Sequence, residues 1–317
     1  MAIVNTVLGP IETSMMGFTL SHEHIIGSSA GIGRTYPEFL DRKSTIEEGV
    51  RQLRSARSEG VTTIVDVTTL DLGRDIRMLK EVSLRSKVQI IAATGIWLDI
   101  PRVFWNSTPD DVAALFIREI HQGIERTGIK PGVIKVATGP EGVTRQGELI
   151  LRAAARAHKA TGVPITTHTG ARERVGEQQL RIFKEEGVSP SRIYIGHSND
   201  TTDMEYLLGL LKDGAWLGLD HFPGGGVPGS PNLQERAELI KRLVDAGFAH
   251  RILLSHDWVV THGLLSRDAE ANRTGGSPDG FLFISRRLLP LLSSLGVREK
   301  DICQIILENP RNFFDGS

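Results

Sequence analysis

The sequence lacks the features that mark several large classes of protein. With a single cysteine, Cys303, in 317 residues, the chain has no possibility of an intramolecular disulfide. It contains no apolar run of the roughly 18 residues that a membrane helix needs. Its N-terminus shows neither a basic segment nor a long apolar stretch of the kind that forms a secretory signal. We therefore predict no membrane partner, no signal peptide and a cytoplasmic location.

An excess of charge of one sign is missing as well. Lys and Arg together number 37, against 38 Asp and Glu, which leaves a formal net charge of −1. A nucleic-acid-binding domain normally carries a basic patch and a high isoelectric point, so we predict no nucleic-acid partner. The remaining composition, 40% hydrophobic and 24% charged, is typical of a globular protein with a substantial core.

Short apolar runs alternate along the chain with longer amphipathic stretches. Consecutive apolar residues are typical of parallel strands buried on both faces. The eight runs are residues 18–25, 61–67, 88–96, 132–138, 163–169, 193–198, 216–222 and 251–258. Helical patterns between them include residues 47–58, 108–126, 147–161, 176–186, 203–212 and 232–246. This alternation predicts an α/β protein in which residues 1–317 form a single (β/α)8 TIM barrel domain.

Three segments outside this alternation predict a hairpin and two loops. Two short segments at residues 3–7 and 11–13, separated by Gly9-Pro10, predict a small N-terminal β-hairpin ahead of the barrel. Residues 223–231, rich in Gly, Pro and Ser, predict a loop after the seventh strand. Residues 261–279 predict a long polar loop after the eighth strand.

Histidines and one aspartate occupy equivalent points on several predicted strands. His22 and His24 end the first strand, His168 the fifth, His197 the sixth and Asp257 the eighth. Barrel enzymes carry their chemistry at the C-terminal ends of the strands, and residues i and i+2 of a strand point to the same side. A single histidine in such a place is as often a packed core or loop residue. The whole set predicts a metal site, because imidazole and carboxylate are good ligands for zinc and its neighbours.

Lys135 is the unusual member of this group. It lies in the fourth strand between Ile134 and Val136, where a buried ammonium is costly. One interpretation is a buried salt bridge to an acidic side chain. The other is that loss of water lowers the pKa of Lys135 and leaves a nucleophilic neutral amine. Such an amine can capture carbon dioxide as a carbamate, whose two oxygens can bridge two metal ions about 3.5–4 Å apart around a shared hydroxide.

Together these residues resemble the phosphotriesterase family of the amidohydrolase superfamily. The resemblance covers nearly the whole chain. Besides the six residues above, it rests on Asn5-Thr6-Val7-x-Gly9-Pro10-Ile11, Gly17-Phe18-Thr19-Leu20-x-His22-Glu23-His24, Thr63-Ile64-Val65-Asp66, Gly73-Arg74-Asp75, Gly176-Glu177-Gln178-Gln179 and Asn309-Pro310.

The resemblance implies a barrel with two divalent metal ions, zinc first, with cobalt or manganese as alternatives. It implies that a carbamate on Lys135, derived from carbon dioxide, bridges the ions together with hydroxide. His22, His24, Lys135 and Asp257 would hold the more buried ion, and Lys135, His168 and His197 the more exposed one. Members of the family are commonly homodimers, which we expect here too.

Two branches of the family differ at three positions. This chain has Trp97, then His221 after Gly218-Leu219-Asp220, and Trp258 after Asp257, a combination similar to that of the phosphotriesterases. The lactonase branch usually has Tyr, Arg, and Tyr or Ala there, although His256 before the metal aspartate is lactonase-like. The resemblance thus implies a phosphoric triester hydrolase of the aryldialkylphosphatase type, acting on paraoxon-like small-molecule esters. The alternatives are a lactonase, acting on acyl-homoserine or other lactones, and an inactive metal-binding barrel.

The family match also suggests roles for residues around the ions. Asp257 would accept a proton from the hydroxide, and His221 and Asp200 would pass it onward. His221 could instead be an ordinary loop histidine. Apolar pockets for the ester groups and the leaving group are expected from side chains that could equally be core at the top of the barrel, namely Trp97, Leu72, Phe104 and Trp258.

Overall fold

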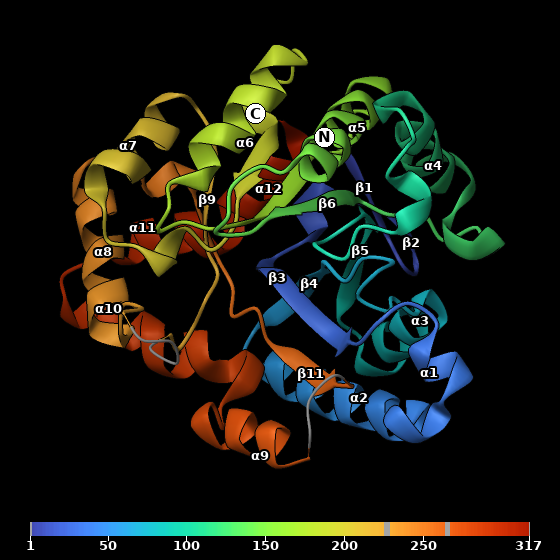
Figure 1. Ribbon diagram of the computed structural model, residues 1–317. Helices are drawn as coiled ribbons and strands as arrows, with labels where there is room; N and C mark the ends of the chain where they lie inside the picture. The colour runs from blue at the N-terminus through green and yellow to red at the C-terminus, as the bar shows by residue number, and fades with distance from the viewer. Residues whose placement is uncertain (1, 225–228, 264–266, 317) are drawn as a thin grey trace.

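The computed structural model describes residues 2–224, 229–263 and 267–316, and a barrel of parallel strands occupies its centre (Figure 1). Each strand pairs in parallel with the next along the chain. Their residues are almost all buried, as expected for strands covered on both faces. In chain order the strands are β3 (Phe18–Gly27), β4 (Val61–Asp66), β5 (Gln89–Gly95), β6 (Val133–Thr138), β7 (Ile165–Thr169), β8 (Ile193–Ile195), β9 (Trp216–Leu219) and β10 (Ile252–Leu254).

The last strand of the barrel is interrupted where it meets the first. β10 pairs with β9, and after a break the chain continues as β11 (Val259–His262), which pairs in parallel with β3. Across the break, the Asp257 amide donates to the His22 carbonyl at 3.1 Å and the His24 amide donates to the Trp258 carbonyl at 2.9 Å. The barrel is therefore closed, and the predicted (β/α)8 architecture is confirmed.

Amphipathic helices cover the outside of the barrel (Figure 1). Several begin at a side chain that accepts a backbone N–H, and Thr108 and Asn232 form complete capping boxes with Asp111 and Glu235. The main helices are α2 (Arg42–Ser58), α3 (Ile76–Ser86), α4 (Pro109–Gln122), α5 (Arg145–Thr161), α6 (Val175–Glu185), α7 (Met204–Lys212), α8 (Leu233–Asp245), α9 (Arg267–Gly276), α10 (Leu289–Ser294), α11 (Glu299–Cys303) and α12 (Asn309–Asp315).

Shorter helical turns join these elements. They are α1 (Ile32–Thr35) and the 3₁₀ turns η1 (Thr13–Met15), η2 (Pro37–Phe39), η3 (Arg102–Phe104), η4 (Ile124–Arg126), η5 (Pro190–Arg192), η6 (Ser198–Asp200), η7 (Ala249–Arg251) and η8 (Gly280–Leu282), with π-helical turns at η9 (Ile284–Leu288) and η10 (Gln304–Glu308).

The predicted N-terminal hairpin is present. β1 (Ile3–Thr6) and β2 (Gly9–Glu12) pair antiparallel, with Ile3 opposite Glu12. The Val7 amide donates to the carbonyl of Ile90, near the start of β5. The hairpin therefore lies at the N-terminal end of the strands, away from the end where the predicted metal ligands lie.

The structure corrects the predicted ends of one helix and three strands. The predicted helix 108–126 ends at Gln122, because Gly123 (φ 97°) and Glu125 (φ 51°) leave helical geometry. The strands predicted to run to residues 198, 222 and 258 end at Ile195, Leu219 and Leu254.

The predicted loop 261–279 was wrong in part, since it contains α9 and the end of β11. Its polar composition hid a helix that carries Ala269 and Ala271 among charged residues. Of the predicted loop 223–231, residues 225–228 lie outside the described residues. Among the helices that the structure describes, none is both long enough and apolar enough to cross a bilayer.

Candidate metal centre

The six predicted ligands come from five strands or strand ends around one mouth of the barrel. His22 and His24 lie within β3, Lys135 within β6 and His168 within β7. His197 lies just beyond the end of β8 at Ile195, and Asp257 just beyond the end of β10 at Leu254. Both have left-handed backbones, with φ of 56° and 55°. Such conformations are costly for residues other than glycine and concentrate at functional sites. Here they turn two side chains back toward the barrel axis after the strands have ended.

The first group of ligands surrounds Asp257. Its Oδ1 lies 3.0 Å from His24 Nε2 and 3.5 Å from His22 Nε2. Lys135 Nζ lies 3.2 Å from the same His22 nitrogen. His22, His24 and Asp257 each offer one ligand atom within 4.8 Å of the others, a spacing at which they can hold one ion.

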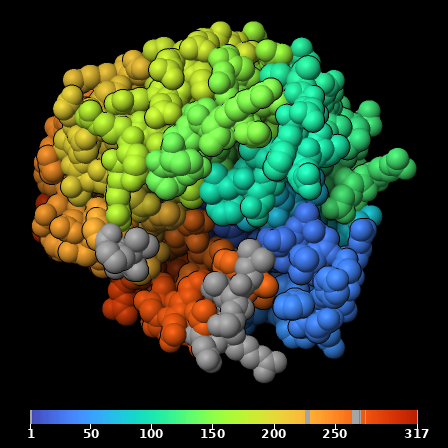
Figure 2. Space-filling model, viewed as in Figure 1, coloured from blue at the N-terminus to red at the C-terminus, as the bar shows by residue number. Residues whose placement is uncertain are grey.

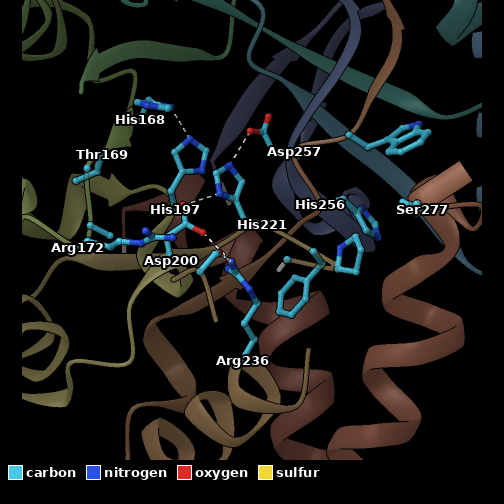
Figure 3. A pocket seen from close by; sticks show the side chains of 18 of the residues that line it. His168, Thr169, Arg172, His197, Asp200, His221, Arg236, His256, Asp257 and Ser277 are labelled. Atoms are coloured by element: carbon cyan, nitrogen blue, oxygen red, sulfur yellow. Dashed lines mark hydrogen bonds and ion pairs between the residues drawn. The ribbon is translucent and has the colours of Figure 1, made fainter. Parts of the chain in front are cut away.

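The second group adjoins the first. His168 Nδ1 lies 2.7 Å from His197 Nε2, and the two rings meet edge to face (Figure 3). The His197 ring centroid is 4.9 Å from that of His22, so one histidine of each group stands beside the other. The structure therefore brings all six predicted residues together.

The outer nitrogens of three rings are already bonded. His22 Nδ1 and His197 Nδ1 each contact a carboxylate oxygen of Asp220, at 2.7 and 2.9 Å. His24 Nδ1 lies 2.8 Å from Thr68 Oγ1, whose own hydrogen goes to the Ile26 carbonyl. With Nδ1 of each ring bonded in this way, Nε2 faces the centre and is the nitrogen that can bind an ion. Such a donor set fits a divalent ion of the zinc type.

Electrostatics favour neutral ligands. Burial lowers the pKa of His22 to about 3, with the nearby Lys135 acting in the same direction. Burial and the neighbouring His197 hold the pKa of His168 well below its usual value. Lys135, 1% exposed, has its pKa lowered by burial to about 8. These side chains therefore carry free lone pairs near neutral pH far more readily than exposed ones would.

Lys135 owes its place to a close approach of backbones. Gly95, at the end of β5, has φ 117°, and a Cβ there would lie 1.9 Å from the Lys135 carbonyl oxygen. A side chain at this position would push β5 and β6 apart. Glycine therefore lets the strand that carries Lys135 pair tightly beside the metal ligands.

A chain of hydrogen bonds runs outward from Asp257. His221 joins Asp257 Oδ2 through Nε2 at 2.9 Å and Asp200 Oδ2 through Nδ1 at 2.7 Å (Figure 3). Partial burial opposes charge on His221, but the hydrogen bonds to the two carboxylates outweigh it and raise the pKa to about 10. Burial would raise the pKa of Asp200, but His221 and Arg236 lower it to about 2. The predicted order Asp257, His221, Asp200 is thus a continuous line of contacts.

Arg236 fixes the outer end of that line. It is 1% exposed and donates to Asp200 Oδ1 at 2.8 Å and to the Asn199 carbonyl at 2.6 Å. Its remaining donors go to Pro231 and Ser230. Nothing in the sequence pattern singled out Arg236, because α8, which carries it, lies far along the chain from Asp200.

Glu23, between the two β3 histidines, shapes the break in the last strand. It accepts from the Ser255 hydroxyl, from the amides of His256 and Trp258, and from His256 Nδ1 at 2.6 Å. The other nitrogen of His256 accepts from the Ile284 amide at 3.1 Å. His256 therefore has both ring nitrogens hydrogen-bonded within the protein, and it links Glu23 to the backbone at Ile284.

A cavity of about 700 Å³ opens over the centre. His168, His197, His221, Asp200 and Asp257 line its floor. The face in Figure 2 is hollowed at its middle, between the green and the orange segments. The cavity is wide enough for a small-molecule ester.

The four apolar residues predicted to bind substrate are placed differently from one another. Trp258 lines the cavity. Trp97 sets its ring edge-on to His168, with centroids 5.7 Å apart. Leu72 and Phe104 are not part of the cavity wall that the described residues form, and Phe104 packs against the hydrophobic core. Their part in substrate binding stays a prediction.

Comparison with known proteins now identifies the family. Residues 2–314 match the model of the phosphotriesterase family. The chain belongs to this family. A solved structure of the phosphotriesterase from Mycobacterium tuberculosis superposes with a TM-score of 0.93 at 37% identity, covering 99% of this chain and 98% of that one. Membership makes the chain one of a family of hydrolases and confirms the family resemblance.

Relatives within the family carry different names. An aryldialkylphosphatase from Saccharolobus solfataricus is 36% identical over 96% of both chains. A more distant relative, the N-acetyltaurine hydrolase of Dictyostelium discoideum, is 30% identical over 84% of this chain and 72% of its own length. One is named for a phosphate ester and the other for an amide, so family membership alone leaves the substrate open.

Proposed function

We propose that this chain hydrolyses organophosphate triesters of the paraoxon type at a centre of two divalent ions. The observation that carries the proposal is the convergence of His22, His24, His168, His197, Lys135 and Asp257 at one barrel mouth, beneath a cavity of about 700 Å³. Zinc is the ion we propose first, with cobalt or manganese as substitutes, because imidazole and carboxylate donors suit all three.

The two groups of ligands divide between the two ions. His22, His24 and Asp257 would hold the inner one, and His168 and His197 the outer one. Lys135, carboxylated by carbon dioxide, would serve both, since its ammonium nitrogen lies 3.2 Å from His22 and its charge also acts on His168. Bound ions supply polarisation of the phosphoryl oxygen and a nucleophile derived from water at neutral pH.

The protein's own side chains provide the proton path. Asp257 Oδ2 faces the His221 ring at 2.9 Å, and His221 faces Asp200 at 2.7 Å. A cation bound at Asp257 would weaken the pull of that carboxylate on His221, so a His221 with a bare Nε2 could accept a proton from Asp257 and release its Nδ1 hydrogen to Asp200, at the cavity wall. Arg236 holds Asp200 in the orientation that accepts from His221. Asp257, His221 and Asp200 would thus remove the proton that the attacking water loses.

The walls of the cavity favour a triester over a lactone. Trp258 offers a flat apolar surface beside Asp257, suited to a planar aromatic leaving group. His221 stands where an arginine would supply a donor to a lactone ring, and both its nitrogens are occupied by carboxylates. His256, the lactonase-like residue, is fully bonded to Glu23 and Ile284 and has no nitrogen left for a substrate.

A panel of substrates on metal-loaded protein tests the proposal. We expect kcat/KM for paraoxon-type triesters to exceed that for acyl-homoserine lactones, simple γ-lactones and N-acyl amides. A lactone or amide that wins by more than about tenfold, near 1.4 kcal/mol in transition-state stabilisation, would overturn the substrate assignment. Loss of all activities after chelation would still support a metal hydrolase, whereas no hydrolysis of any substrate by fully loaded protein would favour an inactive metal-binding barrel.

A further inference from the structure

Asp220 is a buried carboxylate that belongs to neither group of predicted ligands, yet it contacts both. It follows β9 and is 0% exposed. Its Oδ2 accepts from His22 Nδ1 at 2.7 Å and from the Tyr194 hydroxyl at 2.7 Å. Its Oδ1 accepts from His197 Nδ1 at 2.9 Å and from the His197 amide at 2.7 Å. One histidine of each proposed ion site therefore rests on the same side chain.

This set of donors uses the whole capacity of the carboxylate. An ionised Asp is an acceptor only, with about four lone-pair sites on its two oxygens, and here four donors occupy them. The amide of His197 cannot reverse its role, because a backbone N–H is always a donor. Both imidazoles must consequently carry their hydrogen on Nδ1 and present a bare Nε2 to the centre.

We propose that Asp220 is a positioning residue that fixes the tautomer of His22 and of His197 together and so couples the two ion sites. The inference rests on the proposed metal centre. A partner that serves one histidine alone, as Thr68 serves His24, tunes one site. A shared carboxylate makes both sites depend on the two acceptor oxygens of a single residue.

The substitution Asp220→Asn replaces one of the two carboxylate oxygens by an NH2 group and so tests the two oxygens separately. Its amide oxygen must face the His197 amide, since that donor is fixed, and its NH2 group then faces His22 Nδ1 and Tyr194. The tyrosine hydroxyl can rotate to accept, but His22 must move its hydrogen to Nε2, where it blocks the inner site. We therefore expect Asp220→Asn to weaken the inner ion about 10- to 100-fold and to spare the outer one.

Two further variants serve as comparisons, one that removes both acceptor oxygens and one that should leave metal binding unchanged. Asp220→Ala removes the acceptor from both histidines, and both ions should bind more weakly. Tyr194→Phe deletes the hydroxyl donor to Asp220 and leaves both imidazole contacts with Asp220 in place, so it should keep two ions at wild-type affinity. Purified metal-free proteins would be titrated with zinc against a competing chelator, with bound zinc per chain measured by mass spectrometry. Urea unfolding of the metal-free forms would show that each variant is folded.

A second measurement needs no variant. In metal-free wild-type protein labelled with ¹⁵N-histidine, two-bond ¹H–¹⁵N correlation spectra report which ring nitrogen carries the hydrogen. We expect the Nδ1–H form for both His22 and His197, and an Nε2–H form for either overturns the proposal. Two ions in wild type with affinities changed less than about threefold in Asp220→Asn and Asp220→Ala, below the usual effect of such partners, overturn the coupling alone. A wild-type protein that binds no metal overturns the proposed centre and the coupling together.

Discussion

Assembly of the metal centre should depend on pH through Lys135. Carbon dioxide reacts with a neutral amine, so the rate of carboxylation follows the unprotonated fraction of this side chain. Burial lowers the pKa of Lys135 to about 8, from 10.5 for an ordinary lysine. About one chain in ten then carries a neutral Lys135 at pH 7, against about one in 3,000 for an exposed lysine.

The lowered pKa also determines how the rate of carboxylation changes with pH. Between pH 7 and 8 the neutral fraction of a group with this pKa rises about fivefold, and above pH 8 it can rise only about twofold more. A lysine of ordinary pKa would gain about tenfold per pH unit up to pH 9.5. His22 does not disturb the measurement, because burial lowers its pKa to about 3 and it stays neutral across this range.

The assay is the recovery of activity by chelator-stripped protein mixed with zinc at a fixed concentration of dissolved carbon dioxide. We expect the rate to rise steeply from pH 6.5 to 8, to level off above pH 8.5, and to increase with carbon dioxide. A rate that keeps rising tenfold per unit, or that ignores carbon dioxide, would refute the role of a buried, carboxylated Lys135.

A matched pair of variants completes this test. Lys135→Ala should lose nearly all activity and much of its metal, and short carboxylic acids added with zinc should restore part of the activity by filling the vacated space. Lys130→Ala removes an exposed lysine just before the same strand and should behave as wild type. Full activity in Lys135→Ala would contradict the bridging role.

Three further substitutions test the surroundings of the centre. His221→Asn should change the ranking of substrates while metal content stays intact; uniform loss together with loss of metal would make His221 structural. Arg236→Met leaves Asp200 without its buried guanidinium and should lower the free energy of unfolding in urea by about 3 kcal/mol; a change under about 1 kcal/mol would show that the pair matters little. Gly95→Ala places a Cβ against the Lys135 carbonyl and should cost about 3 kcal/mol or more, so wild-type stability and metal content in this variant would disprove the close approach.

The six ligands could be predicted from the sequence because each lies on or at the end of a recognisable strand, and the barrel fold brings those strand ends together. The spacing of His22 and His24 predicts that both side chains point to the same side, because side chains in a strand repeat every two residues. His168, His197 and Asp257 each end a recognisable apolar run, Lys135 lies within one, and parallel strands bring their C-terminal ends to one mouth. The strand ends were less accurate, since His197 and Asp257 lie beyond the regular strands in left-handed conformations.

The residues that support the ligands could not be predicted in the same way. Asp220 contacts His22 across 198 positions, and Glu23 contacts His256 across 233. No local period links partners so far apart. The available signal was an acidic residue next to a predicted proton-relay residue, as Asp220 is next to His221, and it appeared only as part of the family motif.

The cavity wall was the least predictable part. Helix α9 lies in a segment that reads as a polar loop, and Asn272 from this helix lines the cavity. Helix formation there depends on packing against the rest of the barrel, which overrides a weak local pattern. Leu72 and Phe104 lie in connections beyond the strands, where the direction of a side chain cannot be read from spacing.

Anomalous diffraction from crystals of protein grown with zinc tests the central claim most directly. We predict two peaks at the zinc edge in each chain, one among His22, His24 and Asp257 and one beside His168 and His197, with electron density for a carboxyl group extending from Lys135 Nζ between them. A single peak, peaks elsewhere in the chain, or an unmodified Lys135 between two fully occupied ions would contradict the binuclear centre proposed for this protein.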